Sequence, residues 1–177
     1  MPLLQELFVE MLQDIYWAEK SQVTALTAMS RKTTSEELGN AFVEHVAQTE
    51  DQVYRLEKVF GMMGREPGMR RGEAMAALIS EANGLAADTE KGSMTRDVAL
   101  IAAGQKIEHY EIAAYGTLVQ LASTMHLNAA AGLLEQSLRE EKEADMLLTD
   151  VAEHDVNWQA LENGGHGEVI QPLEKRN

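Results

Sequence analysis

Glu108 and Glu111 lie on a helical stripe that would otherwise be apolar, and acids in such a place point to metal chemistry. Steps of three and four residues between positions 101 and 122 trace one face of a helix. That face contains Ile101, Gly104, Glu108, Glu111, Tyr115, Leu118 and Ala122. An unpaired buried carboxylate costs several kcal/mol, so acids normally lie at the surface or beside a cation. Acids brought to the same level by other helices would therefore predict a pair of bound metal ions.

Two more stripes have apolar ends and acids in the middle. The stripe near the N-terminus contains Phe8, Leu12, Ile15, Glu19, Gln22 and Leu26, and the last one contains Leu134, Leu138, Glu141, Asp145, Leu148 and Ala152. The midpoints of antiparallel helices lie at the same height in a bundle. We therefore expect the five acids on the three stripes to converge: Glu19, Glu108, Glu111, Glu141 and Asp145.

The second helical segment has a stripe without any acid, formed by Phe42, Val46, Thr49, Val53, Leu56 and Phe60. His45 flanks this stripe and is the natural nitrogen ligand, because carboxylate-rich metal sites often include imidazole. Gln48 and Glu50 are the competing ligands on this segment. On the last segment, Glu140 competes with Glu141.

Each acid also has a structural interpretation, namely an ion pair with a nearby base. The bases available for such pairs are Arg55, Lys106 and Lys142. Tyr115 follows Glu111 by one turn, where it would either hydrogen-bond that carboxylate or simply fill the core.

The composition limits the classes of function. The chain has 177 residues, 45% of them hydrophobic and 25% charged, which is typical of one globular domain. The absence of cysteine excludes disulfides, iron–sulfur clusters and thiolate chemistry. A net charge of −14 argues against a nucleic-acid partner. No apolar run approaches the roughly 18 residues of a membrane span and no signal-peptide pattern opens the chain, so a cytoplasmic location is predicted.

The elements that must position these residues are all predicted to be helices, since Ala, Leu, Met, Glu, Gln and Lys dominate. Four long helices are expected over 3–29, 36–60, 96–125 and 129–154, with a shorter fifth helix over 73–87. A capping box of Thr34 and Glu37 is expected to start the second helix, and Thr95 to cap the third long one.

The lengths of the connections predict how the helices are arranged. Short turns join the first and the last pair, which makes each pair antiparallel, whereas the connection between the pairs is long enough to cross the whole bundle. The prediction is an all-α, ferritin-like antiparallel four-helix bundle with a crossover connection containing the fifth helix. Residues 1–160 would form the bundle, and the polar residues 161–177 a flexible tail.

Four segments of the chain resemble the YciE/YciF-type stress proteins of the ferritin-like superfamily. They are Asp14–Lys20, Glu44–Glu57, Glu108–Tyr115 and Glu140–Asp145, and the resemblance extends in order over about residues 3–152. It implies a dimeric bundle with a crossover helix, a di-iron centre and a role in stress responses.

The resemblance to the wider superfamily is partial. Glu19, Glu108 and Glu111 match acids of rubrerythrin-like sites, which also carry an E-x-x-H motif on the second and fourth long helices. Here His45 and Gln48 form a reversed version of that motif, and the last helix has acids in place of histidine. Without cysteines there is no rubrerythrin-type electron-donor domain, so electrons would come from a separate partner.

The leading interpretation is a homodimeric protein that binds a dinuclear iron or manganese centre. The predicted metal ligands are Glu19, His45, Glu108, Glu111, Glu141 and Asp145. Such a centre would oxidise Fe(II) or reduce peroxide during stress. The alternative is a non-catalytic dimeric stress or scaffold protein without a functional metal, in which bases neutralise the acids.

Overall fold

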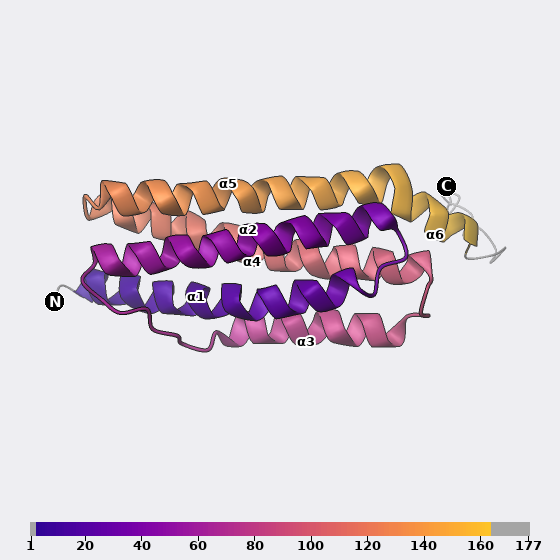
Figure 1. Ribbon diagram of the computed structural model, residues 1–177, viewed down its shortest axis with the longest axis horizontal. Coiled ribbons are helices and arrows are strands. Elements are labelled where there is room, and N and C mark those ends of the chain that lie inside the picture. The colour runs from indigo at the N-terminus through magenta and orange to yellow at the C-terminus, as the bar shows by residue number, and fades with distance from the viewer. Residues whose placement is uncertain (1–2, 164–177) are drawn as a thin grey trace, which may run out of the picture.

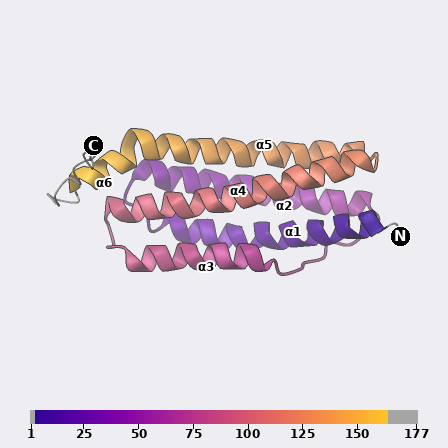
Figure 2. The ribbon, with the colours of Figure 1, turned by 180° about the vertical axis from the view of Figure 1, so that it is seen from behind.

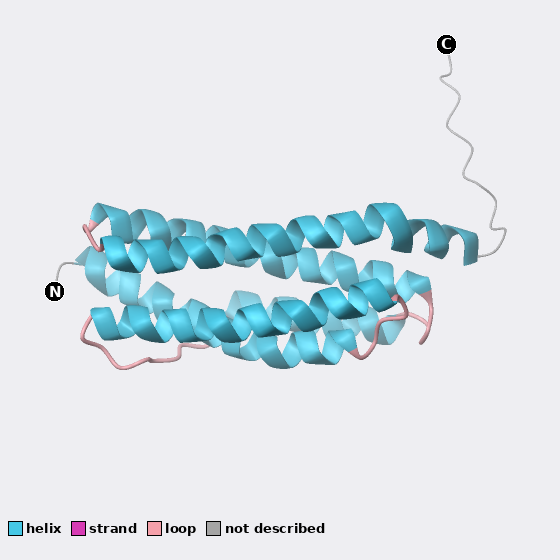
Figure 3. Cartoon of the chain, turned by 45° about the horizontal axis from the view of Figure 1, so that its top comes forward, coloured by secondary structure: helices cyan, strands magenta, loops and turns pink. Residues whose placement is uncertain are grey.

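Helices make up nearly all of the computed structural model, which describes residues 3–163 (Figure 1). The elements are α1 (Leu3–Ser30), α2 (Glu36–Met62), α3 (Glu73–Asp88), α4 (Met94–Thr124), α5 (Asn128–Val151) and α6 (Asn157–Asn163). A single π-helical turn, Ala152–Val156, joins α5 to α6. Loops occur at the two ends of the bundle and in the stretch that leads into α3 (Figure 3). Among these helices, none has both the length and the apolar composition that crossing a bilayer requires.

The four long helices form a bundle of two antiparallel hairpins, α1–α2 and α4–α5. Helix α2 packs beside α5 and α1 packs beside α4, while α3 lies along the outside against α4 and α1 (Figure 2). The connection containing α3 crosses the length of the bundle, so α2 and α4 run in the same direction (Figure 1). This arrangement confirms the predicted all-α, ferritin-like bundle with its crossover helix.

The core consists of two apolar clusters with a polar layer between them. One cluster is built around Phe8, Phe60 and Leu134, and the other around Phe42 and Leu148. The stripes predicted for α1 and α4 are buried at every position. The acids in the middle of these stripes are therefore shielded from water by apolar side chains on both sides.

The start of α2 differs from the prediction. Ser35, not Thr34, is the N-cap, and its hydroxyl accepts a hydrogen bond from the backbone amide of Leu38 at 3.3 Å. The amide of Thr34 is instead bound by the carboxylate of Asp97, which holds this residue outside the helix. The prediction of a capping box formed by Thr34 and Glu37 was therefore wrong, because the contact with Asp97 of α4 sets the residue at which α2 begins.

The start of α4 also differs. Ser93 is the N-cap and accepts a hydrogen bond from the amide of Arg96 at 3.2 Å, so Thr95 lies inside the first turn and does not cap it. At the other end of the chain, α6 continues to Asn163, beyond the domain boundary predicted at residue 160. The remainder of the predicted tail, 164–177, lies outside the described residues.

Asp97 ties the first turn of α4 to the α1–α2 turn. Its fully buried carboxylate accepts hydrogen bonds from the amides of Thr34 at 2.9 Å and Ser35 at 2.6 Å. Replacing Asp97 with alanine leaves both amides without this partner, and hydrogen bonds to charged groups contribute about 1.5–3 kcal/mol each. With two such bonds at the low end of this range, we expect Asp97→Ala to lower the free energy of unfolding by about 3 kcal/mol in urea titrations.

Asp97→Asn is the matched control, because its amide oxygen still accepts a hydrogen bond and the expected loss is smaller. Equal stability of Asp97→Ala and the wild type would contradict this role.

Candidate metal centre

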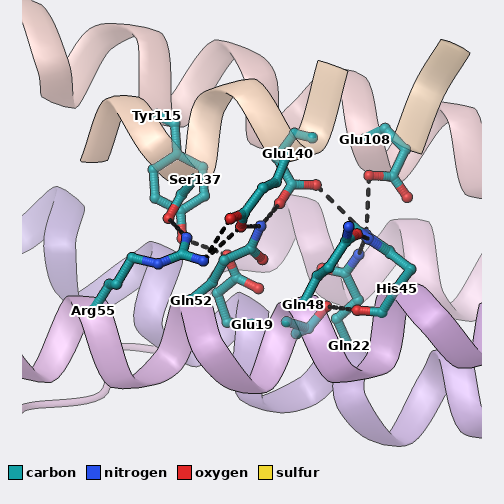
Figure 4. A network of polar contacts seen from close by, with 12 residues as sticks. Glu19, Gln22, His45, Gln48, Gln52, Arg55, Glu108, Tyr115, Ser137 and Glu140 are labelled. Carbon is teal, nitrogen blue, oxygen red and sulfur yellow. Dashed lines mark hydrogen bonds and ion pairs between the residues drawn. The ribbon is translucent and has the colours of Figure 1, made fainter. Parts of the chain in front are cut away.

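Three helices bring one histidine and three glutamates together in the polar layer. One ligand atom from each of His45 (α2), Glu108 and Glu111 (α4) and Glu141 (α5) lies within 4.8 Å of the others. Glu19 of α1 is also fully buried in this layer (Figure 4). These five residues, Glu19, His45, Glu108, Glu111 and Glu141, are called the carboxylate cluster below. Four of the five acids predicted to converge are thus brought to one level of the bundle.

The regular period of the helices explains this convergence. Glu108 and Glu111 are three residues apart, which places both on the same face of α4. Glu19 and Gln22 have the same spacing on α1 and are also buried. Both helices are apolar above and below these residues, so burial of the stripes carries the polar side chains inside.

His45 presents one ring nitrogen to the cluster and the other to Gln48. Its Nε2 lies 3.2 Å from Oε2 of Glu108 and 3.5 Å from Oε2 of Glu141. Its Nδ1 lies 3.1 Å from the amide oxygen of Gln48. An oxygen at that distance favours a proton on Nδ1, which leaves Nε2 as the metal-binding nitrogen of the neutral ring.

Most of the oxygens in the carboxylate cluster lack hydrogen-bond donors. Six carboxylate oxygens of Glu19, Glu108, Glu111 and Glu141 receive no hydrogen bond from the residues in the range 3–163 when the ring of His45 is neutral. The other two accept one each, from Tyr115 and from Gln52. Buried polar atoms in native proteins are nearly always satisfied. The cluster therefore offers free electron pairs on its oxygens, as a cation site requires. Few hydrogen-bond donors compete with a cation for them.

Protons bind unusually tightly to this cluster when no cation balances its charge. Burial, together with the nearby Glu108, raises the pKa of Glu19 to about 8. Burial and the neighbouring carboxylates raise the pKa values of Glu111 and Glu141 well above the ordinary value for glutamate. Burial disfavours a charged His45, but the adjacent Glu108 outweighs this effect and raises its pKa to about 9.

Tyr115 closes one side of the cluster. Its hydroxyl is fully buried and donates a hydrogen bond to Oε1 of Glu19, not to Glu111 (Figure 4). Burial and the adjacent Glu19 raise the pKa of Tyr115 well above its ordinary value, so it remains a donor. The second oxygen of Glu19 stays free of hydrogen bonds from the described residues.

A second polar network borders the cluster and separates the roles of Glu140 and Glu141. Arg55 donates to both oxygens of Glu140 at 2.7 Å and to the hydroxyl of Ser137 at 2.7 Å. Gln52 donates to Glu140 at 3.2 Å and also to Glu141 (Figure 4). Glu140 is thus neutralised by Arg55, while Glu141 keeps one oxygen for the cluster.

The sequence did not indicate Gln52, Arg55 or Ser137 as buried residues. On α2 the buried face includes His45, Gln52 and Arg55, whereas Val46 and Val53 of the predicted stripe are only partly buried. On α2 the apolar stripe pointed to Val46 and Val53, so apolar periodicity did not indicate these polar residues. The only available signal was the helical spacing of the polar residues themselves.

Asp145 and Glu50 lie away from the cluster. Asp145 is partly exposed, and its Oδ2 lies 3.3 Å from Nε2 of His109 on the bundle surface. Glu50 is exposed, which leaves His45 with its partner Gln48 as the contribution of α2. The convergence predicted for Asp145 is not found, because α5 turns Ser137 and Glu141 inward instead.

Comparisons with known proteins agree with this fold. A family model described as Domain of unknown function (DUF892) matches residues 3–161. The Escherichia coli protein YciF is 43% identical over 161 residues, which cover 90% of this chain and 96% of YciF.

Solved structures of related proteins also match this chain. The crystal structure of the E. coli stress protein YciF matches with a TM-score of 0.84 at 42% identity, over 89% of this chain and 99% of that one. YcfI from Rhodopseudomonas palustris matches with a TM-score of 0.82 at 34% identity, over 84% and 94% of the two chains. A protein from Xanthomonas campestris matches with a TM-score of 0.69 at 25% identity, over 92% and 98% of the chains.

Proposed function

Because this chain belongs to the DUF892 family of YciF-type stress proteins, we propose that it binds two ions of iron or manganese inside its bundle. The observation that carries the proposal is the set of six buried carboxylate oxygens without hydrogen-bond donors among the described residues. Four carboxylates carry four negative charges, which two divalent cations would balance while His45 stays neutral.

In this proposal the ligands would be divided between two ions. His45, Glu108, Glu111 and Glu141 are close enough to one another to bind one ion together. Glu19 would supply a ligand for the second ion, and Glu111, both of whose oxygens lack a hydrogen-bond donor, could contribute to either ion. Oxygen-rich ligands with a single imidazole suit iron and manganese better than copper or structural zinc.

A bound pair of such ions would supply redox chemistry, in which Fe(II) is oxidised or peroxide is reduced. The chain contributes the surroundings: the carboxylates stabilise the more highly charged oxidised ions, and the two apolar clusters exclude bulk water. Tyr115 holds Glu19 in place through its hydrogen bond. A separate electron donor is part of this proposal, since the chain has no cysteine for an iron–sulfur cluster.

Metal analysis of the purified protein tests this function. Apoprotein loaded anaerobically with Fe(II) or with Mn(II) should contain about two equivalents per chain, as two-metal carboxylate sites do. Glu108→Ala and Glu111→Ala each remove a ligand of the cluster and should lose most of this metal, while Glu135→Ala on the exposed surface of α5 should keep it.

Glu111→Gln distinguishes loss of a ligand from loss of the fold, since it keeps the shape of the side chain. A wild-type protein that stays free of metal, with unchanged thermal unfolding in Fe(II) and Mn(II), would contradict the proposal.

A second function, that of a non-catalytic dimeric stress or scaffold protein, is favoured by the network around Arg55. There a base already neutralises one of the inward acids, Glu140, without any metal. On this alternative the same metal analysis should find no specific binding, and sedimentation should give the mass of a homodimer for both the wild type and Glu108→Ala.

A further inference from the structure

A cavity of about 140 Å³ lies between α2 and α5 and reaches the carboxylate cluster from the surface. His45 and Glu108 form its inner end, and both are buried. Exposed Glu44 and Glu143 line it where it meets the surface. The other lining residues are Ala41, Phe42, Gln48, Ala144, Leu147 and Leu148.

A shallow hollow on the surface continues this cavity outward over the first turns of α2. Ala41, Glu44 and Leu147 line both the hollow and the cavity, so the two adjoin. The hollow adds two more exposed acids, Glu36 and Glu37. A series of acidic side chains thus leads from the surface to the opening.

The inner end of the cavity has a feature that ordinary surface acids lack. Both carboxylate oxygens of Glu108 are buried and receive no hydrogen bond from the described residues. Nε2 of His45 lies 3.2 Å from one of them. The cavity therefore ends at groups that can replace the water around a cation.

We propose that divalent cations enter the carboxylate cluster through this cavity, a path that rests on the metal-binding function proposed above. Acids lining an opening of one charge sign raise the local concentration of cations and the rate of association. Inside, carboxylate and imidazole groups replace waters of the hydration shell in turn. Phe42 and Leu148 form apolar walls beside the passage.

The size of the cavity restricts which ions and molecules can pass through it to the carboxylate cluster. At about 30 Å³ per water, its volume corresponds to between four and five water molecules. A hydrated cation must lose part of its shell to pass, and small oxidants such as dioxygen or peroxide also fit.

The rate of Mn(II) uptake by apoprotein tests the path, with the loss of the free Mn(II) signal in rapid-freeze electron paramagnetic resonance as the readout. The double variant Glu44→Gln/Glu143→Gln removes the acids at the opening. Its uptake at low salt should be about tenfold slower than that of the wild type, and the difference should shrink at high salt. The amount of Mn(II) bound at equilibrium should not change.

The matched control is Glu66→Gln/Glu135→Gln, which removes the same charge from exposed acids elsewhere on the molecule. It should leave the uptake rate within about twofold of the wild type, because exposed charges beyond a Debye length are screened. Ala144→Leu narrows the passage without changing charge and should slow uptake at every salt concentration.

The possible outcomes distinguish a failure of the proposed entry path from a failure of the proposed metal site. Slower uptake in both the acidic and the narrowing variants, with unchanged equilibrium binding, supports the path. Normal rates in both variants, in a protein that binds Mn(II), overturn the path and leave the metal site intact. A wild-type protein that binds no Mn(II) overturns both.

Discussion

Apoprotein held in a chelator is expected to lose stability steadily as the pH rises from about 6 to 9. The buried acids of the cluster bind protons more tightly in the folded than in the unfolded state. For Glu19 the pKa rises from 4.5 to about 8 on folding, and for His45 it rises from 6.5 to about 9. Since the folded state binds more protons in each case, the free energy of unfolding must fall with pH.

The free energy of unfolding changes with pH in the same direction for both groups. Glu19 disfavours folding least below pH 4.5 and most above about pH 8, when its charge is forced into the core. His45 contributes stability that is fully present below pH 6.5 and is lost as the pH passes about 9. Between pH 6 and 9, Glu19 alone should lower the free energy of unfolding by about 2.7 kcal/mol, at about 1.4 kcal/mol per pH unit up to its folded pKa. His45 adds a change of the same sign, and together they make this the largest effect expected.

Metal should reverse this trend, because cations replace the protons and bind more tightly when the ligands are deprotonated. At pH 8, Mn(II) at 100 times its dissociation constant should restore about 2.7 kcal/mol. Urea unfolding at pH 6, 7, 8 and 9, in chelator and in Mn(II), measures both curves.

Two variants identify the groups responsible. Glu111→Gln removes one titrating group, so its apoprotein should show a flatter dependence on pH and little response to metal. Glu135→Gln, on the surface, should behave as the wild type. Apoprotein whose free energy of unfolding is constant or rises between pH 6 and 9 would show that the cluster does not titrate as inferred.

Arg55→Met is expected to destabilise the protein by about 3 kcal/mol, within the range for breaking a buried ion pair. The side chains of Arg55 and Glu140 are 9% and 17% exposed, so water cannot fully replace the lost partner. The variant leaves Glu140 charged next to Glu141, which already belongs to an acidic cluster. In a protein of this size the melting temperature should fall by about 6–12 °C.

The double variant Arg55→Met/Glu140→Met separates the cost of an unpaired charge from the loss of packing. Replacing both members of a buried pair by apolar residues is often neutral, so this variant should recover most of the lost stability. A double-mutant cycle in urea gives the coupling energy directly. If the double variant is less stable than Arg55→Met, the pair contributes through packing and not through charge.

Both predictions concern the same layer of the molecule. Two apolar clusters stabilise the ends of the bundle, while the middle holds acids whose ionised form opposes folding in the absence of a cation. Natural proteins seldom keep such groups without a functional reason. The unfavourable middle of this bundle is therefore the strongest physical argument for metal binding.

The sequence by itself determined the helices, their order and the inward acids of α1 and α4. Glu19, Glu108 and Glu111 lie on stripes whose apolar ends repeat at the helical period, so local geometry and burial together predict their direction. The short and long connections likewise determined the ferritin-like arrangement, because an antiparallel neighbour needs only a short turn.

Only the tertiary structure decided how α2 and α5 are rotated about their own axes. It placed His45 and Glu141 inside and left Asp145 at the surface, and it paired Arg55 with Glu140. Rotation depends on how closely neighbouring helices approach.

Gly104 shows this dependence on close approach. A Cβ atom at this position would lie 3.0 Å from a methyl group of Leu148 and 3.4 Å from the ring of Phe42. Such close contacts between helices far apart in the chain determine which polar side chains face inward. A pattern of apolar residues within one helix does not contain that information.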